Sequence, residues 1–251
     1  MTNKEIAASV KDKYTRALAR SPDAARFYAK LRDGTATMTD VLKFSDVAAD
    51  TLTETFGIEF RANFPNGIPM DAVSEIVPDG LRKNCMDVLD ASRVTVTAKN
   101  KKAGSGIQGL RLNPDSDRID GLTKHLSENL ADGELPANTK SLIRNLANSE
   151  VDGSIKENVK FLDASGMKTT VTRIYSGKGL RDGPCQWCLD REGTDVPVSE
   201  AEARGMFARH EGCGCQIDCK TEKGTQRQTD WTHNKWADKP EVLEARKQIG
   251  L

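Results

Sequence analysis

The chain has 251 residues, which is enough for one large domain or two small ones. Its 37 basic and 37 acidic residues balance, and they balance separately within 1–150 and 151–251, so the sequence has neither a basic half for nucleic acid nor an acidic tail. Only 37% of residues are hydrophobic and 5% aromatic, and neither a membrane-spanning run nor the apolar stretch of a signal peptide is present. This composition predicts a protein of the aqueous phase, built from elongated helices or packed against neighbouring subunits.

The first third of the sequence predicts helices. Apolar residues recur at helical spacing from Ile6 to Leu18, and Ser21 with Pro22 forms the start of a second helix that ends near Gly34. A third helix is predicted from about residue 39 to Gly57. Its apolar stripe consists of Val41, Leu42, Phe44, Val47 and Leu52. Because aromatic side chains are scarce, we expect this stripe to pack against a partner protein.

The next segment predicts a helical pair that is split at Pro78. Residues 93–98 alternate β-branched side chains, which is typical of a strand. The glycines of 104–109 match the spacing of a dinucleotide-binding loop, but Pro114 opposes the helix that must follow such a loop. Since 91–114 holds five basic residues and no acidic one, we interpret this segment as a mobile basic loop, in solvent or on a partner. Helical patterns resume at 115–131, 136–148 and 152–164, and 168–175 predicts a strand.

Five of the six cysteines lie between residues 185 and 219. Crowding of this kind, in a chain without a signal peptide, favours a metal site over a disulfide framework. Two cysteines separated by two residues, followed about 22 residues later by a second Cys/His cluster, can supply the thiolate and imidazole ligands of a tetrahedral Zn²⁺. The candidate ligands are Cys185, Cys188 and His210, with Cys213 or Cys215 as the fourth and Cys219 in reserve.

A catalytic zinc has less support in the sequence. The segment from Pro184 to Cys188 matches half of the nucleobase-deaminase signature, whose other half is H-x-E. The histidine upstream, His125, is followed by Glu128 at the wrong spacing, and there is no H-E-x-x-H. Four protein ligands would also leave no open position for water. We therefore predict one structural Zn²⁺ per chain and no enzymatic activity, with a zinc hydrolase or deaminase as an alternative.

The predicted fold class is mainly α (α+β overall), with an elongated helical N-terminal part and a small mixed α/β module stabilised by zinc. We expect a helical N-terminal region at 1–92, a basic glycine-rich loop with a helical middle region at 93–165, and the Cys/His zinc module and tail at 166–251.

Several segments, in one order, resemble a known family. They include GPCQWCLDREG at 183–193, MFARHEGCGC at 206–215 and GTQRQTDW at 224–231, with further similarity at 100–109, 117–122 and 151–158. Together they are similar to the Mu F-like head-morphogenesis proteins, which are minor head proteins of tailed phages. The similarity covers about residues 93–236. The acidic stretch 195–204 and Cys219 depart from the family pattern, which leaves the fourth zinc ligand open.

The resemblance implies a structural minor capsid protein that acts in head assembly or genome delivery. Its expected location is the virion, at the capsid interior or portal vertex, after assembly in the host cytoplasm. The implied partners are the phage portal protein and other capsid proteins. The basic stretch 93–111 could also contact packaged DNA. No membrane contact is expected.

A zinc-ribbon protein that binds nucleic acid is the main alternative. It is motivated by the Cys/His cluster and by the basic stretch 93–111. The charge around the cluster opposes it, because 181–223 holds six basic and nine acidic residues.

Overall fold

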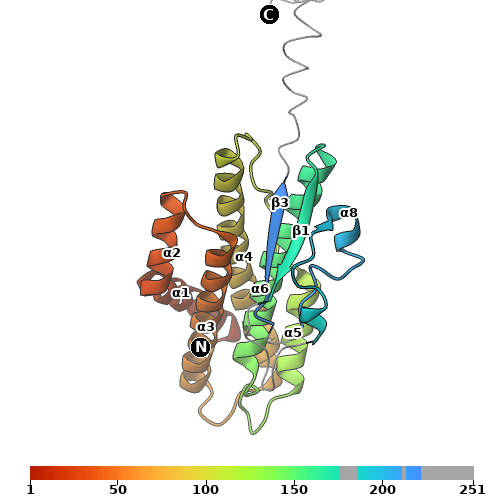
Figure 1. The fold of residues 1–251 in the computed structure, drawn as a ribbon. Coiled ribbons are helices and arrows are strands. Elements are labelled where there is room, and N and C mark those ends of the chain that lie inside the picture. The colour runs from red at the N-terminus through yellow and green to blue at the C-terminus, as the bar shows by residue number, and fades with distance from the viewer. Residues whose placement is uncertain (176–185, 211–212, 222–251) are drawn as a thin grey trace, which may run out of the picture.

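The computed structural model describes residues 1–175, 186–210 and 213–221. Its long helices are α1 (Asn3–Arg20), α2 (Pro22–Arg32), α3 (Met38–Asn63), α4 (Met70–Lys102), α5 (Ser116–Glu128) and α6 (Thr139–Ala164). The C-terminal part contributes β1 (Thr169–Ile174), α7 (Gln186–Leu189), β2 (Val196–Pro197), α8 (Val198–Ala201) and β3 (Gln216–Thr221). The predicted mainly α class, with a small mixed C-terminal part, is confirmed (Figure 1). Among these helices none is both long and apolar enough to cross a membrane.

Capping residues fix the starts of the N-terminal helices. The Thr2 hydroxyl and the Glu5 carboxylate form a capping box at α1, and Thr37 and Asp40 form a second one at α3. Ser21 accepts a hydrogen bond from the first turn of α2, so the predicted start of that helix is confirmed. These short polar signals explain why two breaks separate three helices within the first 40 residues.

The apolar stripe of α3 faces the interior of the helical bundle. Val41, Phe44 and Leu52 are buried, and the Phe44 ring stacks on Phe27 of α2 with ring centroids 4.5 Å apart. The expectation that this stripe packs against a partner protein is therefore wrong for the folded chain. The bundle closes without many aromatic rings because small residues such as Ala48 and Ala49, both fully buried, let α3 approach α1, α4 and α6 closely.

Two helices are longer than the sequence predicts. Helix α3 continues past Gly57 because Phe56 and Phe60 carry its buried stripe forward by more than a turn. Helix α4 runs unbroken through Pro78, whose missing N–H costs one backbone hydrogen bond. The buried side chains of Val77 and Leu81 on either side of the proline pack into the same core, and this packing holds the helix together.

The strand predicted at 93–98 is wrong, because these residues form the end of α4. Their burial follows a helical period: Ser92, Thr95 and Val96 face the protein, whereas Val94 is exposed. Packing of one helix face against the bundle thus overrides the strand preference of the β-branched side chains. The expected boundary between residues 92 and 93 lies inside this helix.

The glycine-rich segment after α4 is not a free loop over its whole length. The Gly109 N–H donates to the Thr97 hydroxyl at 2.9 Å, and the Leu110 N–H donates to Asn158 of α6 at 3.0 Å. A Cβ at Gly109 would lie 2.4 Å from the Arg93 carbonyl oxygen, so only glycine fits there. The interpretation as a mobile loop is wrong at this end, where backbone contacts hold the segment on α4 and α6. No helix opens directly after these glycines, since α5 begins at Ser116.

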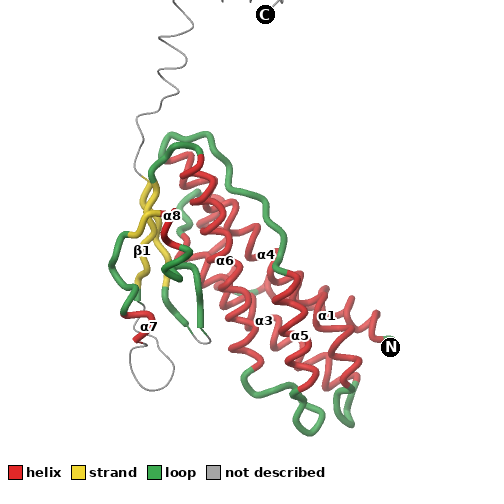
Figure 2. Tube along the Cα trace, turned by 90° about the vertical axis from the view of Figure 1, so that its right-hand side faces the viewer, coloured by secondary structure: helices red, strands yellow, loops and turns green. Residues whose placement is uncertain are grey.

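A three-stranded antiparallel sheet with the order β2-β1-β3 covers one side of the bundle. The strand predicted at 168–175 is confirmed as β1. Figure 2 shows the sheet and α7 on the far side of the helices from α1. Strands β1 and β3 contact α6, which is one continuous helix rather than the predicted two. Val171, Val196 and Ile217 extend the core of the helices into the sheet, so the two parts share apolar packing.

Candidate metal centre

Three cysteine sulfurs converge at the end of the sheet. Cys188 lies on α7, and Cys213 and Cys215 lie just before β3. The three sulfur atoms are within 4.8 Å of one another, and those of Cys188 and Cys213 are 3.7 Å apart. A tetrahedral zinc ion with metal–sulfur bonds of about 2.3 Å requires sulfur atoms about 3.8 Å apart. The three residues are 1%, 5% and 2% exposed, respectively. They form a possible metal site enclosed by protein.

The other predicted ligands differ in their placement. His210 is half-buried, and its Nε2 atom lies 3.2 Å from the Cys188 sulfur, but it is not within 4.8 Å of all three sulfur atoms. Cys185 lies outside the described residues. Cys219 belongs to β3, pairs with Val171 of β1 and is not part of the cluster. Burial raises the pKa of the Cys219 thiol to about 12, which keeps this thiol neutral. The reserve ligand is therefore not brought to the site.

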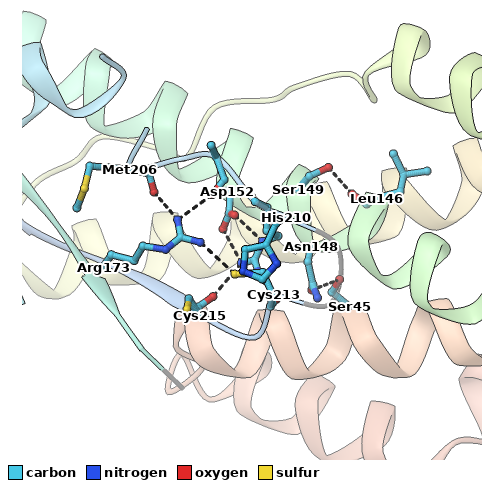
Figure 3. Close-up of polar contacts among 12 residues, drawn as sticks. Ser45, Leu146, Asn148, Ser149, Asp152, Arg173, Met206, His210, Cys213 and Cys215 are labelled. Atoms are coloured by element: carbon cyan, nitrogen blue, oxygen red, sulfur yellow. Dashed lines mark hydrogen bonds and ion pairs between the residues drawn. The ribbon is translucent and has the colours of Figure 1, made fainter. Parts of the chain in front are cut away.

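A buried arginine of β1 contacts the cluster. The Arg173 side chain is 0% exposed, and its Nη2 atom donates to the Cys213 sulfur at 3.1 Å. Its Nη1 atom donates to the carbonyl oxygens of Met206 and Ala208, at 2.9 and 2.8 Å (Figure 3). The guanidinium also lies over the Trp187 ring, 4.9 Å from the centroid. The arginine therefore brings a positive charge directly to one sulfur atom.

A second buried arginine ties the cysteine segment to the helices. Arg209 makes a two-point ion pair with Asp152 of α6, with nitrogen–oxygen distances of 2.6 and 2.9 Å. Its remaining N–H groups donate to the carbonyl oxygens of Cys213 and Cys215, at 2.7 and 3.0 Å. The side chains of Arg209 and Asp152 are 3% and 1% exposed. The ion pair is thus held out of water, and four of the five N–H groups of Arg209 donate hydrogen bonds.

Comparison of the chain with family models, with curated proteins and with solved structures finds no match.

The surroundings give the cysteines different acidities. Burial raises the pKa of Cys213, but the Cys215 N–H and the charges of Arg209 and Arg173 more than offset this effect, so the pKa is lowered. Burial and the neighbouring cysteines raise the pKa of Cys188. Of these two thiols, Cys213 therefore loses its proton more readily, and the thiolate is the form that binds a metal cation.

Sequence reasoning missed three residues of this region, namely Asp152, Arg173 and Arg209. A signal for one of them is present in β1, where Thr169, Val171 and Arg173 occupy alternate, inward-facing positions. A charged residue in such a series indicates a buried guanidinium with dedicated partners. No comparable pattern marks Asp152, because its partner lies 57 positions away in the sequence.

Proposed function

We propose that Cys188, Cys213 and Cys215 bind one structural Zn²⁺, with His210 as the fourth ligand. The observation that carries this proposal is the convergence of three buried sulfur atoms within 4.8 Å of one another, with those of Cys188 and Cys213 3.7 Å apart, close to the separation in tetrahedral zinc sites. A zinc ion with three thiolates and a neutral imidazole has a net charge of −1. Arg173, Arg209 and Asp152 together contribute +1, so the buried assembly is neutral. A fourth thiolate in place of His210 would leave an unbalanced negative charge in the interior.

A structural role fits this environment better than a catalytic one. A catalytic zinc keeps one position open to water and substrate, whereas the three cysteines are almost completely buried. The ion would instead join α7 to the start of β3. Helix α7 has only four residues, and the residues that carry Cys213 and Cys215 form no helix or strand, so a metal cross-link would supply stability that a hydrophobic core does not.

We expect metal analysis of the full chain, purified without added zinc, to find about one equivalent of Zn²⁺. After exchange with Co²⁺, the charge-transfer and d–d bands should report three sulfur ligands and one nitrogen ligand. His210→Asn should alter this spectrum, whereas Cys185→Ser should leave it unchanged. Protein without metal, in which Cys188 and Cys213 form a disulfide, would contradict the site, and a changed spectrum in Cys185→Ser would reassign the fourth ligand.

For the biological role, we propose a minor structural protein of a tailed-phage head, associated with the portal and inner capsid. Support comes from the ordered segments that resemble the head-morphogenesis family. It also comes from the fact that three of the four cysteines in the resembling segments, Cys188, Cys213 and Cys215, converge in the fold. A helical bundle with a small sheet cross-linked by zinc is suited to a binding role, because binding requires a rigid surface and does not require an active site. Docking would not use the apolar stripe of α3, because Val41, Phe44 and Leu52 are buried inside the bundle.

In the phage that encodes this chain, we expect purified heads to contain it in far fewer copies than the major capsid protein. Quantitative mass spectrometry of heads purified on a density gradient measures this ratio. Deletion of the gene should yield defective heads, and a plasmid copy of the wild-type gene should rescue them. A chain that is absent from heads, and whose deletion leaves particle yield and infectivity unchanged, would contradict the proposal.

A further inference from the structure

We propose that Arg209, anchored on Asp152, is a positioning residue that shapes the cysteine segment for its metal and couples metal binding to helix α6. This inference rests on the proposed zinc site and deepens it. The two residues contact no metal ligand atom in the hydrogen bonds described above. They act through the backbone of the segment that carries two of the ligands.

The contacts of Arg209 have the geometry that positioning requires. One edge of the guanidinium is fixed by both oxygens of Asp152, on the rigid helix α6. The other N–H groups reach the carbonyl oxygens of Cys213 and Cys215, on either side of a single residue. Holding two carbonyl groups so close together in sequence fixes the curvature of the segment. That curvature determines whether the two sulfur atoms point toward the same spot.

Arg173 supports the same arrangement from the sheet. It donates to the Cys213 sulfur itself and to the carbonyl oxygens of Met206 and Ala208, which lie just before the cysteine segment. Arg173 therefore holds the segment to β1, and Arg209, within the same loop, holds it to Asp152 of α6. Neither guanidinium can be replaced by an ammonium group without losing contacts, because each uses the planar fork to reach several acceptors at once.

This arrangement predicts an effect on metal affinity that a purely stabilising ion pair would not have. Residues that orient metal ligands typically change affinity by about 10- to 100-fold when they are replaced. The chain offers a control: Arg144 of α6 makes a two-point ion pair with Asp50 of α3, away from the cysteines and at a more exposed position. Loss of either pair removes an arginine–aspartate contact, but only the pair of Arg209 touches the metal segment.

The test compares wild type, Arg209→Lys and Arg144→Lys as full chains, with zinc affinity measured by competition with a chromophoric chelator at fixed pH. We expect Arg209→Lys to bind zinc about 10- to 100-fold more weakly, with an unchanged Co²⁺ spectrum because the ligands are the same. Arg144→Lys should bind within about 2-fold of wild type. Asp152→Asn should weaken binding in the same direction as Arg209→Lys, and it serves as the second variant if Arg209→Lys does not fold.

Hydrogen exchange of the wild-type protein gives an independent reading of the coupling. Removal of zinc by a chelator should increase exchange in α6 around Asp152 and leave α1 unchanged. Two results would overturn this inference while leaving the zinc site intact. One is an equal zinc affinity in wild type and Arg209→Lys, and the other is a hydrogen-exchange rate in α6 that does not change when a chelator removes zinc. A wild-type chain that binds no zinc would overturn the proposed site and the inference together.

Discussion

Replacement of Cys188 by serine is expected to abolish zinc binding and to unfold the region of the sheet, while α1–α4 stay folded. Loss of one of four ligands removes most of the affinity of a structural site, whose binding free energy is about 10–16 kcal/mol in small zinc domains. Strands β2 and β3 are short and add few apolar side chains to the core, so they depend on the metal. The N-terminal helices bury apolar residues of their own, so their stability does not depend on the metal.

Circular dichroism and limited proteolysis would measure this outcome. Most of the helical signal should remain at 25 °C, and protease should cut selectively after residue 165. Cys219→Ser is the matched control, because this cysteine lies in β3 but outside the cluster, and it should retain one equivalent of zinc. Cooperative loss of the whole helical signal in Cys188→Ser would show instead that helices and sheet are one folding unit, linked through α6.

Phe56→Ala is expected to lower the free energy of unfolding of the helical bundle by about 3–5 kcal/mol. Phe56 is completely buried on α3, and its ring packs beside Phe60 with centroids 5.7 Å apart. Its outer edge fills the space above Gly80 of α4, where an added Cβ would lie only 2.7 Å from the ring. Truncation would therefore leave a cavity that the neighbouring helix cannot close.

Urea unfolding at saturating zinc, followed by circular dichroism, would measure the difference. Phe161→Ala on α6 removes the same ring from a side chain that is 45% exposed, and it should change stability by about 0.5 kcal/mol or less. Gly80→Ala should be destabilising alone but milder in the Phe56→Ala background, because its methyl group enters the vacated space. Equal effects of Phe56→Ala and Phe161→Ala would mean that the bundle is not packed as described.

The sequence by itself determined the elements whose signals are local. Ser21 followed by Pro22 marks the start of α2 wherever that helix later packs. The segment 168–175 is predicted as a strand from its own residues, and it forms β1 in the fold. The crowding of Cys188, Cys213 and Cys215 within a short segment identified three residues that the fold does bring together, because few other arrangements suit so many thiols.

Only the tertiary structure decided the features that depend on distant partners. Residues 93–98 have the side chains of a strand, yet burial of one face against the bundle makes them helical. The stripe of α3 would be apolar whether it packed inside this chain or against another protein. Only the packing of α1, α4 and α6 around it shows that it packs inside this chain. Arg209 and Asp152 are ordinary charged residues in the sequence. Their pairing across 57 positions, out of water and against the cysteine segment, arises from the fold, because a buried charge is tolerated only where its partner is brought to meet it.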